Sequence, residues 1–252
     1  APTATTMILS GVMVKMGLFG LLRWLFPVLP NASYIWGDFI TPLALIGMVY
    51  ASLIAIRQDD LKRLVAYSSI AHIGLMCAAA FAQNASGIQG LMLQMFNHGI
   101  NIIGLWIVVE LIERQFGTRK ISELGGLAQK APAMAILLVI VALANIALPL
   151  TNAFPGEFLM FNGIFGSQTK YNVWFTVLAG LGIILGAVYT LNMIRKVFYG
   201  NTNELTAVTK DINWNEKLAL GIIIVIIFWF GIYPQCMLNE TAASAESIYK
   251  KF

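Results

Sequence analysis

Seven apolar stretches separated by short polar segments constrain this chain more than any other feature. A helix that spans a bilayer needs roughly 20 mostly apolar residues, and stretches near that length recur at residues 5–26, 41–56, 61–82, 88–111, 132–165, 171–193 and 217–233. Only 11% of the 252 residues are charged, whereas soluble domains carry about 25%. So few charges could not cover a water-soluble fold. The sequence therefore predicts an all-α polytopic membrane protein with about seven transmembrane helices.

The fifth stretch is too long for one helix and contains its own interruption. Pro149, Pro155 and Gly156 fall within residues 148–156, and proline breaks the hydrogen-bond ladder of a helix. We expect one helix broken mid-membrane near residues 148–157, as two halves with an unwound centre. Such breaks are tolerated where the backbone lines a cavity, and they mark ion pathways in transporters. A simple proline kink is the alternative.

Basic residues near the helix ends predict the orientation, because cytoplasmic loops carry an excess of Lys and Arg. Eleven of them fall in alternate loops on the N-terminal side: Arg57, Lys62, Arg63, Arg114, Arg119, Lys120, Lys130, Arg195, Lys196, Lys210 and Lys217. The other side has four, which are Arg23, Lys170, Lys250 and Lys251. We expect a cytoplasmic N-terminus and a periplasmic C-terminus. The chain starts without Met and without a signal segment, which we interpret as the later part of a longer protein.

Several classes of site have no motif in this sequence. Cys77 and Cys236 are far apart and lie in no CxxC or Cys/His cluster, which indicates no iron–sulfur, zinc or disulfide framework. There is no GxGxxG segment and no P-loop. The net charge of +4 is spread over several loops, unlike the clustered basic face that binds nucleic acid. We expect no cofactor, metal or nucleic acid on this chain.

Four ionisable residues fall deep inside the predicted spans: Lys15, His72, His98 and Glu157. An ionised group at this depth costs at least about 2.5–3.5 kcal/mol on insertion scales, so such residues are rare and usually functional. Polar neighbours accompany both histidines, with Ser68 and Ser69 before His72 and with Gln94, Asn97 and Asn101 on the helix face of His98. We expect a proton relay supported by this polar path. Hydrogen bonding between helices as structural glue is the alternative.

Other charges lie at helix ends. Asp60, Lys62 and Arg63 open the third span. Charges at a helix mouth are usually interfacial anchors, and we favour that interpretation over a gate. The last span, residues 218–230, has no titratable side chain, so we expect it to face lipid.

These motifs resemble the antiporter-like membrane subunits of respiratory complex I, the NADH:quinone oxidoreductase. Residues 1–4 and 13–17 resemble that family's APTAGS…LLKxG segment, and residues 60–74 are similar to its D-[IL]-K-R-L-[IL]-A-Y-S-S-x-x-H-x-G. Further similarity covers residues 87–90, 94–99, 113–127 and 156–158, at matching spacing along nearly the whole chain. Glu157, in place of a lysine after the break, is typical of one of three sister subunits. The family usually has Leu-Pro-Gly at the break, whereas Leu150 follows Pro149 here and Pro155 is an additional proline.

The resemblance implies a fold of inverted five-helix repeats, each with one broken helix. Residues 1–30 would be the last helix of the first repeat, residues 31–200 the second repeat, and residues 201–252 a loop, a final transmembrane helix and a C-terminal tail. Lys15 would connect two half-channels, His72 and His98 would relay protons, and Glu157 would be the terminal carboxyl toward the exit. The lysine and glutamate of the inlet half-channel would lie upstream.

The resemblance also implies a function, which is coupling of electron transfer from NADH to quinone to proton pumping in a bacterial inner membrane. Partner subunits would bind NADH, FMN, iron–sulfur clusters and quinone. The implied partners are antiporter-like neighbours on both sides, the lateral helix of the distal subunit, and lipids. An Mrp-type cation/proton antiporter or a membrane hydrogenase subunit shares these motifs. A haem-binding electron carrier using His72 and His98, or a purely structural anchor, are further alternatives.

Overall fold

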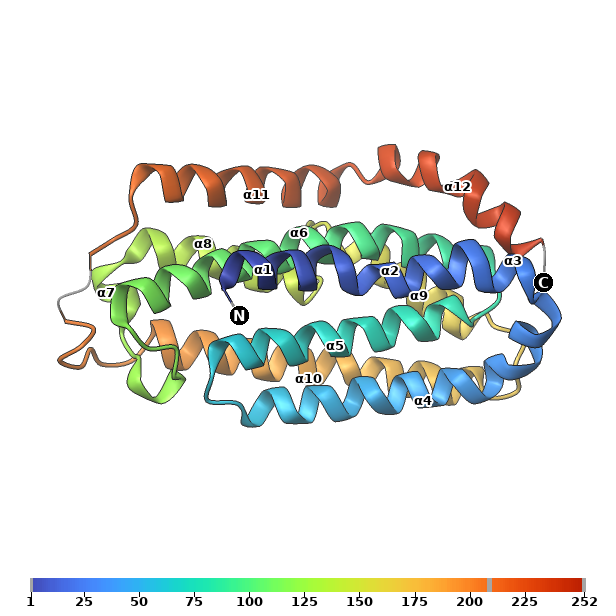
Figure 1. Cartoon of the computed structure of the whole chain (residues 1–252), viewed down its shortest axis with the longest axis horizontal. Coiled ribbons are helices and arrows are strands. Elements are labelled where there is room, and N and C mark those ends of the chain that lie inside the picture. Colours follow the sequence, from blue (N-terminus) through green and yellow to red (C-terminus); the bar gives the residue numbers. More distant parts are fainter. Residues whose placement is uncertain (1, 208–209, 251–252) are drawn as a thin grey trace.

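The computed structural model of this chain describes residues 2–207 and 210–250, which are mostly helical (Figure 1). The first passage joins α1 (Thr3–Ile8), the π-helical turn η1 (Leu9–Met13), α2 (Val14–Gly20), the π-helical turn η2 (Leu21–Leu25) and α3 (Phe26–Val28). There follow α4 (Pro30–Arg57), α5 (Leu61–Ala80), α6 (Ala85–Phe116), the 3-10 turn η3 (Ile121–Glu123), α7 (Leu127–Lys130), α8 (Pro132–Asn145), α9 (Ala153–Phe165), α10 (Asn172–Phe198), α11 (Trp214–Ile232) and α12 (Gln235–Tyr249).

Within these described ranges, six helical runs are long and apolar enough to cross a membrane. They are the first passage, α4, α5, α6, α10 and α11. Helices α8 and α9 follow one another as a seventh, broken passage. The predicted all-α membrane fold with about seven spans, one of them broken, is confirmed.

Two predicted boundaries are wrong for identifiable reasons. The second span begins at Pro30 rather than at residue 41, because the aromatic and polar side chains before Thr41 interrupt the apolar pattern without ending the helix. The interruption of the fifth span covers residues 146–152 rather than 148–157. Pro155 lies in the first turn of α9, where the N–H group that proline lacks would have no helical partner.

The C-terminal tail is also more regular than predicted. Residues 235–249 form α12, which packs against α6. Gln89 on α6 donates a hydrogen bond to the Leu238 carbonyl at 2.9 Å. The polar sequence of α12 lacks the long apolar run by which the other helices were recognised, so only its packing shows it.

Helix α6 runs through the middle of the bundle and packs against α5, α8, α9, α11 and α12. Helices α4, α5 and α10 form a layer on one side of it, and α11 and α12 cover the other (Figure 1). Because α6 carries the predicted polar stripe, this position buries the stripe among helices.

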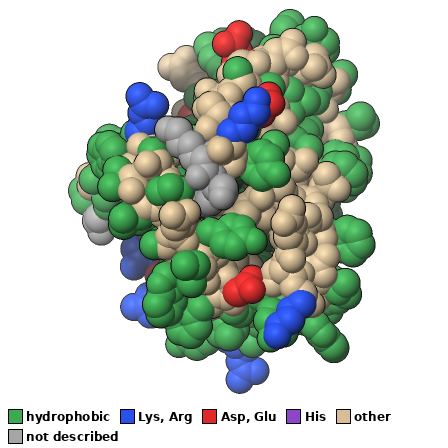
Figure 2. All heavy atoms as spheres, turned by 90° about the vertical axis from the view of Figure 1, so that its right-hand side faces the viewer, with side chains coloured by type: hydrophobic (Ala, Val, Ile, Leu, Met, Phe, Trp, Pro, Cys, Tyr) green, Lys and Arg blue, Asp and Glu red, His purple; other side chains and the backbone are tan. Residues whose placement is uncertain are grey.

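The two ends of the helical bundle differ in charge. The end of α4, the start of α5, the ends of α6 and α10, and the start of α11 meet at one end of the bundle (Figure 1). The eleven basic residues predicted for one side lie in these helix ends and in the segments that connect them. Figure 2 views the opposite end, where hydrophobic side chains crowd the edge and charged ones are scattered. Two residues named above, Ala1 and Lys251, lie outside the described residues.

Candidate functional site

The break between α8 and α9 consists of irregular backbone, exposed at residues 148–150 and buried at Thr151 and Asn152. Ala147 and Leu150 have φ angles of 54° and 75°, in the left-handed region that costs an ordinary residue roughly 1–2 kcal/mol. Glycine adopts this conformation without penalty. The break therefore has a glycine-like backbone shape at two residues that carry side chains.

His72 on α5 points toward this break. Its Nδ1 lies 2.8 Å from the Ser68 carbonyl oxygen and its Nε2 lies 2.9 Å from the Asn145 carbonyl oxygen. A carbonyl oxygen only accepts hydrogen bonds, so a neutral imidazole can satisfy one of these contacts and an imidazolium can satisfy both. A proton that reaches His72 therefore finds an acceptor already in place.

His98 on α6 stacks on His72. The ring centroids are 4.7 Å apart and the ring planes differ by 24°. His98 is 1% exposed, and its Nε2 has no hydrogen-bond partner among the described residues. Two positive charges this close repel each other strongly away from water, so the stacked pair favours one proton over two.

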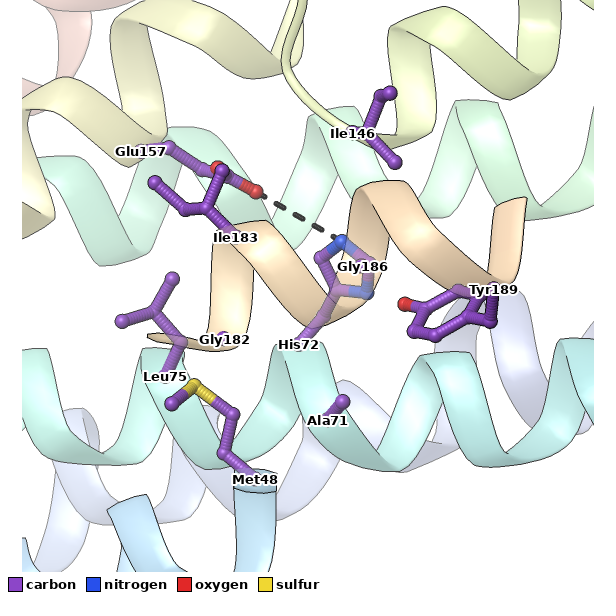
Figure 3. A pocket seen from close by; sticks show the side chains of 10 residues that line it. All are labelled: Met48, Ala71, His72, Leu75, Ile146, Glu157, Gly182, Ile183, Gly186 and Tyr189. Atoms are coloured by element: carbon purple, nitrogen blue, oxygen red, sulfur yellow. Dashed lines mark ion pairs between the residues drawn. The ribbon is translucent and has the colours of Figure 1, made fainter. Parts of the chain in front are cut away.

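Glu157 follows the break in α9 and is 6% exposed. Its Oε1 lies 3.7 Å from His72 Nε2 and accepts a long hydrogen bond from Gln94 Nε2 at 3.4 Å. Figure 3 shows the carboxyl group and the imidazole directed toward each other from α9 and α5. The break thus brings a buried acid beside a buried base.

The polar stripe of α6 pairs with backbone groups on either side of the break. Asn97 Nδ2 donates to the Asn152 carbonyl at 2.7 Å, and Asn101 Nδ2 donates to the Ala144 carbonyl at 3.1 Å. Asn152 Nδ2 returns a long bond to the Asn97 carbonyl at 3.4 Å. These bonds join the stripe of α6 to the main chain on both sides of the break.

Further polar atoms of this region have no protein partner. Within the described ranges, the buried side-chain atoms without a hydrogen bond are Gln94 Oε1, Asn97 Oδ1, His98 Nε2, Asn101 Oδ1, Trp106 Nε1, Asn145 Oδ1 and Asn152 Oδ1. Buried polar groups normally bond to protein or to ordered water. Apart from Trp106, these atoms belong to the stripe or to the facing break, so this interface is suited to hold water.

A small cavity adjoins His72 and Glu157. It has a volume of about 30 Å³ and is also lined by Met48, Leu75 and Tyr189 (Figure 3). A single water needs roughly 10–15 Å³ of such space. The cavity can therefore hold a water beside both ionisable groups.

Lys15 on α2 has no direct hydrogen bond or ion pair with the cluster of His72, His98 and Glu157. It is 5% exposed, and its ammonium donates a hydrogen bond to the Ser10 carbonyl, within η1. Its side chain lines a groove between α2 and α6, together with Gly99 and Ile103. Among the described residues no hydrogen bond or ion pair joins Lys15 to either histidine, so a transfer between them needs an intermediate such as water.

Of the two serines that were predicted to support the relay, one joins the polar cluster and the other does not. Ser68 lies inside the polar cluster at 1% exposure, whereas the Ser69 hydroxyl bonds back to the Val65 carbonyl of its own helix at 3.2 Å. The structure therefore brings together the two histidines, Glu157, Ser68 and the α6 amides. It leaves Ser69 outside this group.

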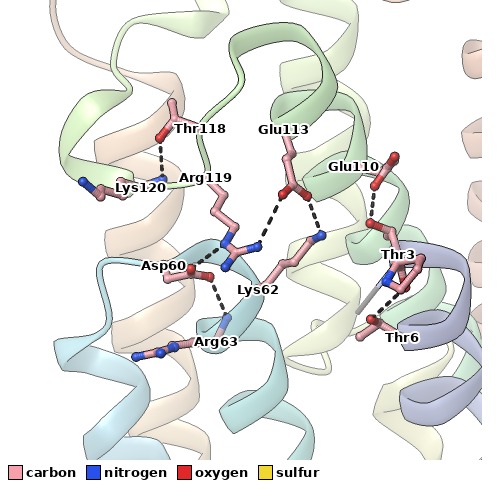
Figure 4. A network of polar contacts seen from close by, with 11 residues as sticks. Thr3, Thr6, Asp60, Lys62, Arg63, Glu110, Glu113, Thr118, Arg119 and Lys120 are labelled. Atoms are coloured by element: carbon pink, nitrogen blue, oxygen red, sulfur yellow. Dashed lines mark hydrogen bonds and ion pairs between the residues drawn. The ribbon is translucent and has the colours of Figure 1, made fainter.

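The charged residues at the start of α5 form a separate network (Figure 4). Asp60 caps α5 by accepting from the Arg63 backbone N–H at 3.1 Å, and it pairs with Arg119 at 2.6 Å. The hydrogen bond and the charge of Asp60 raise the pKa of Arg119. Glu113 pairs with both Lys62 and Arg119. These contacts tie a loop to two helix ends, which supports the anchor interpretation over a gate.

Three residues of the cluster were missed by the reasoning from sequence. Tyr189 on α10 donates its hydroxyl to Ser68 Oγ at 3.0 Å, and Asn145 Nδ2 donates to the same oxygen at 3.2 Å. Asn152 was part of the predicted break but had no assigned role. Each of these residues could have been noticed as a polar side chain inside an apolar run. Tyr189 also lies away from the membrane–water interface, where tyrosine is normally enriched.

The two histidines do not fit a shared haem iron. Axial ligands direct one nitrogen each at the metal from opposite sides, whereas these rings turn their faces to each other at 4.7 Å. A proton relay needs no such convergence. The geometry favours relay over electron transfer.

Comparison with known proteins identifies the family of this chain. Residues 1–186 match the family described as NADH:quinone oxidoreductase/Mrp antiporter, TM. The chain belongs to this family. Within it, NADH-quinone oxidoreductase subunit M of Rickettsia typhi is 39% identical over 253 residues, which cover 100% of this chain and 50% of the relative. NADH-ubiquinone oxidoreductase chain 4 of Marchantia polymorpha is 37% identical over 249 residues, or 98% of this chain and 50% of the relative.

Two solved structures contain chains with the same fold. Respiratory complex I from Thermus thermophilus contains a chain that matches with a TM-score of 0.88 at 27% identity, over 95% of this chain and 50% of that one. A chain of the Mrp complex from Dietzia sp. DQ12-45-1b matches with a TM-score of 0.88 at 16% identity, and the match covers 98% of this chain and 53% of that one. The predicted membership among antiporter-like subunits is confirmed, and the chain spans about half the length of the curated relatives it matches.

Proposed function

We propose that this chain forms part of a proton-translocating membrane subunit of NADH:quinone oxidoreductase. Protons would pass along Lys15, His98, His72 and Glu157. The observation that carries the proposal is the stacked histidine pair with a buried glutamate 3.7 Å from one ring, at the break of a transmembrane helix.

The cluster couples its groups electrostatically. Two unit charges about 4 Å apart interact by about 4 kcal/mol at an effective dielectric constant near 20. Moving one proton against ~100 mV requires about 2.3 kcal/mol. A change of charge on one group is therefore large enough to drive a proton from its neighbour. The two carbonyl acceptors at His72 hold the proton between His98 and Glu157.

The hydrogen-bonded side chains supply the path between these groups. The side-chain oxygens of Gln94, Asn97 and Asn101 are buried and unpaired, and they can orient water along α6. The cavity beside His72 and Glu157 provides a further site for water. In this proposal Lys15 delivers its proton through such water.

The setting is also part of the proposal. We propose a bacterial inner membrane, with the basic end of the bundle in the cytoplasm and the opposite end in the periplasm, because eleven basic residues cluster at one end. Other membrane subunits of the complex would flank the chain, among them antiporter-like neighbours and the lateral helix of the distal subunit. NADH, FMN, iron–sulfur clusters and quinone would belong to partner subunits.

The test uses the full-length subunit in the assembled complex, reconstituted in proteoliposomes. We expect Glu157→Gln, His72→Gln and Lys15→Ala to reduce the number of protons pumped per NADH oxidised several-fold or to abolish pumping. Glu240→Gln, on the exposed face of α12, is the control and should pump normally. Wild-type pumping in all three relay variants would contradict the proposal.

A cation/proton antiporter of the Mrp type is the second candidate, favoured by the shared fold of the Dietzia chain. The two candidates differ in their partners and in their driving force. NADH oxidation by the co-purified complex supports the first. Sodium-driven proton exchange without redox activity supports the second.

A further inference from the structure

A pocket lies at the end of the bundle opposite the eleven basic residues, where α4 and α10 begin and α5 ends (Figure 1). It has a volume of about 270 Å³. Buried side chains form its floor, among them Thr41, Ala78 and Phe175, whereas Asp38 and Lys170 are exposed on its rim. The pocket shares no lining residue with the small cavity of the relay site, so the relay does not account for it.

The rim of this pocket carries a negative and a positive charge that do not pair directly. Among the described residues, no hydrogen bond or ion pair joins the Asp38 carboxylate to another side chain. The pKa of Lys170 is raised by its hydrogen bond with Tyr171 and, to a smaller extent, by the charge of Asp38. The two charges are therefore near each other without touching. A molecule that carries a cation and an anion close together can pair with both.

Hydrogen-bond acceptors gather on the Asp38 side of the pocket. Gln83 donates from Nε2 to the Tyr34 carbonyl at 2.9 Å, one helical turn before Asp38, and this leaves its Oε1 as an acceptor. Thr41 adds a hydroxyl three residues after Asp38 on α4. A primary ammonium has three N–H donors, whereas a quaternary ammonium has none. The acceptors of Asp38, Thr41 and Gln83 therefore suit a primary ammonium.

The backbone holds Gln83 at this rim in an unusual conformation. Its φ angle is 56°, in the left-handed region that residues with a side chain rarely adopt. Gly37 on α4 leaves the space that the Gln83 amide occupies, because an added Cβ there would lie 2.6 Å from Nε2. Backbone strain of this kind clusters at binding sites. The placement of Gln83 is thus a second observation that points to a ligand.

Hydrogen-bond donors gather on the other side of the pocket. Gln168, Thr169 and Lys170 belong to the segment between α9 and α10, and all three line the pocket. The Thr169 hydroxyl accepts from the Tyr171 backbone N–H at 3.3 Å, so its own hydrogen is available to a ligand. Phosphate oxygens accept such hydrogen bonds and pair with the ammonium of lysine. This side of the pocket therefore suits a phosphate group.

Exposed aromatic side chains place the pocket at the level of lipid headgroups. Tyr34 and Trp36 on α4 and Trp174 on α10 are each at least half exposed. Tyr and Trp are enriched at the membrane–water interface, where their rings lie among the headgroups. Farther along the same helices, toward the middle of the span, Leu43 and Val177 are apolar and exposed. A lipid whose headgroup occupies the pocket can therefore keep its acyl chains against these helices.

We propose that this pocket binds the headgroup of a phospholipid with a primary amine, such as an ethanolamine phospholipid. The ammonium of the headgroup pairs with Asp38 and its phosphate pairs with Lys170. The bound headgroup connects α4 to the segment before α10, which no ion pair joins within the described part of the chain. The proposal is independent of the proton relay, because the two sites share no side chain.

The first test uses the assembled complex in nanodiscs that contain photoactivatable ethanolamine, choline or glycerol phospholipids at equal mole fraction. We expect the ethanolamine analogue to crosslink residues 30–42 and 165–176 several-fold more than the other two. Asp38→Asn should reduce its crosslinking to the level of the choline analogue, and Lys170→Gln should reduce crosslinking by all three. Equal crosslinking of the wild-type chain by the ethanolamine and choline analogues overturns the proposal.

Matched controls for these variants lie at the same end of the bundle. Glu246 and Lys250 on α12 are exposed, pair with each other at 2.8 Å and lie outside the pocket. Glu246→Gln and Lys250→Gln should leave the crosslinking unchanged. An effect of Asp38→Asn no larger than that of Glu246→Gln also overturns the proposal.

The second test measures protection of the pocket floor. Thr41, which is 4% exposed, is replaced by cysteine after Cys77→Ala and Cys236→Ser, and the complex is treated with a small thiol reagent. We expect Thr41→Cys to react several-fold more slowly in nanodiscs of ethanolamine phospholipid than in nanodiscs of choline phospholipid. Ala243→Cys, at an exposed position of α12, is the control and should react equally in both. Equal rates for Thr41→Cys in the two lipids contradict the assignment.

A soluble headgroup distinguishes a lipid from a free zwitterion in the same assay. Glycerophosphoethanolamine has the same charges as the lipid headgroup but no acyl chains, and it is added to the complex in nanodiscs of choline phospholipid. We expect it to leave the rate of Thr41→Cys unchanged, because the acyl chains hold the headgroup at the pocket. Protection equal to that by the ethanolamine phospholipid would assign the pocket to a soluble ligand and overturn the lipid site.

Discussion

Tyr189 on α10 donates its hydroxyl to Ser68 Oγ on α5 at 3.0 Å. The same oxygen accepts the Asn145 amide at 3.2 Å, and the Ser68 carbonyl oxygen lies 2.8 Å from His72 Nδ1. One serine thus connects α10, the end of α8 and the histidine closest to Glu157. Shared acceptors of this kind make a buried network cooperative.

Tyr189→Phe tests whether this connection serves proton transfer. The change keeps the ring and removes one hydrogen bond, worth about 0.5–1.5 kcal/mol, so the fold should persist. We expect fewer protons pumped per NADH in the assembled complex, because the Ser68 hydroxyl loses one of the two donors that orient it. Tyr50→Phe, at a position 65% exposed, is the control. Unchanged pumping by Tyr189→Phe would show that the bond is only structural.

Gly163→Ala tests the direct contact between α6 and α9. The added Cβ would lie 2.4 Å from Gly87 Cα, and overpacking of this kind costs about 1–3 kcal/mol. We expect a lower thermal unfolding midpoint. Gly180→Ala on α10, where an added Cβ meets nothing within 4 Å, should gain roughly 0.5–1 kcal/mol from helix propensity. Equal midpoints for the two variants would rule out a tight α6–α9 contact.

Leu150→Gly tests the strain at the break. Leu150 has a φ of 75°, and glycine would relieve roughly 1–2 kcal/mol of left-handed strain while losing roughly 0.5–1 kcal/mol to the flexibility of the unfolded chain. We expect a net gain of up to about 1.5 kcal/mol in the free energy of unfolding. Leu148→Gly, at a residue without positive φ, should destabilise. A loss of stability for Leu150→Gly equal to that for Leu148→Gly would contradict the strain.

Asp60→Ala tests the network at the basic end. It removes the cap of α5 and the pair with Arg119, and loss of a cap alone costs about 1 kcal/mol. The Leu61 amide bonds to the Arg119 carbonyl at 3.0 Å and the Ile121 amide bonds to the Asp59 carbonyl at 2.7 Å. We expect both amides to exchange hydrogen faster. Arg63→Ala, which keeps the backbone donor to Asp60, is the control and should leave exchange unchanged.

Much of the architecture could be predicted, because a chain that crosses a lipid bilayer needs long apolar helices. Long apolar runs fix the spans, and the proline-rich interruption of residues 132–165 fixes the broken one. The residues that meet around the break were also accessible, because His72, His98 and Glu157 are ionisable groups inside apolar segments. Helical spacing alone placed Gln94, Asn97 and Asn101 on the face of His98.

What the sequence could not supply depends on contacts between helices. Nothing local shows that the Ser69 hydroxyl returns to its own helix while Ser68 joins three partners. Tyr189 is one aromatic residue in an apolar run until α10 packs beside α5. The polar helix α12 is stabilised by contact with α6 rather than by an apolar pattern of its own. Pro155 differs from Pro149 only in falling after the start of α9.

The π-helical turn Leu9–Met13 lies immediately before Lys15 in the chain. Such a turn contains one residue more than an α-helical turn. Conversion of this turn to regular α-helix would therefore rotate the following residues by about 100° around the helix axis. Lys15 would then swing away from the Ser10 carbonyl oxygen, so the extra residue of this turn determines the direction in which the ammonium points.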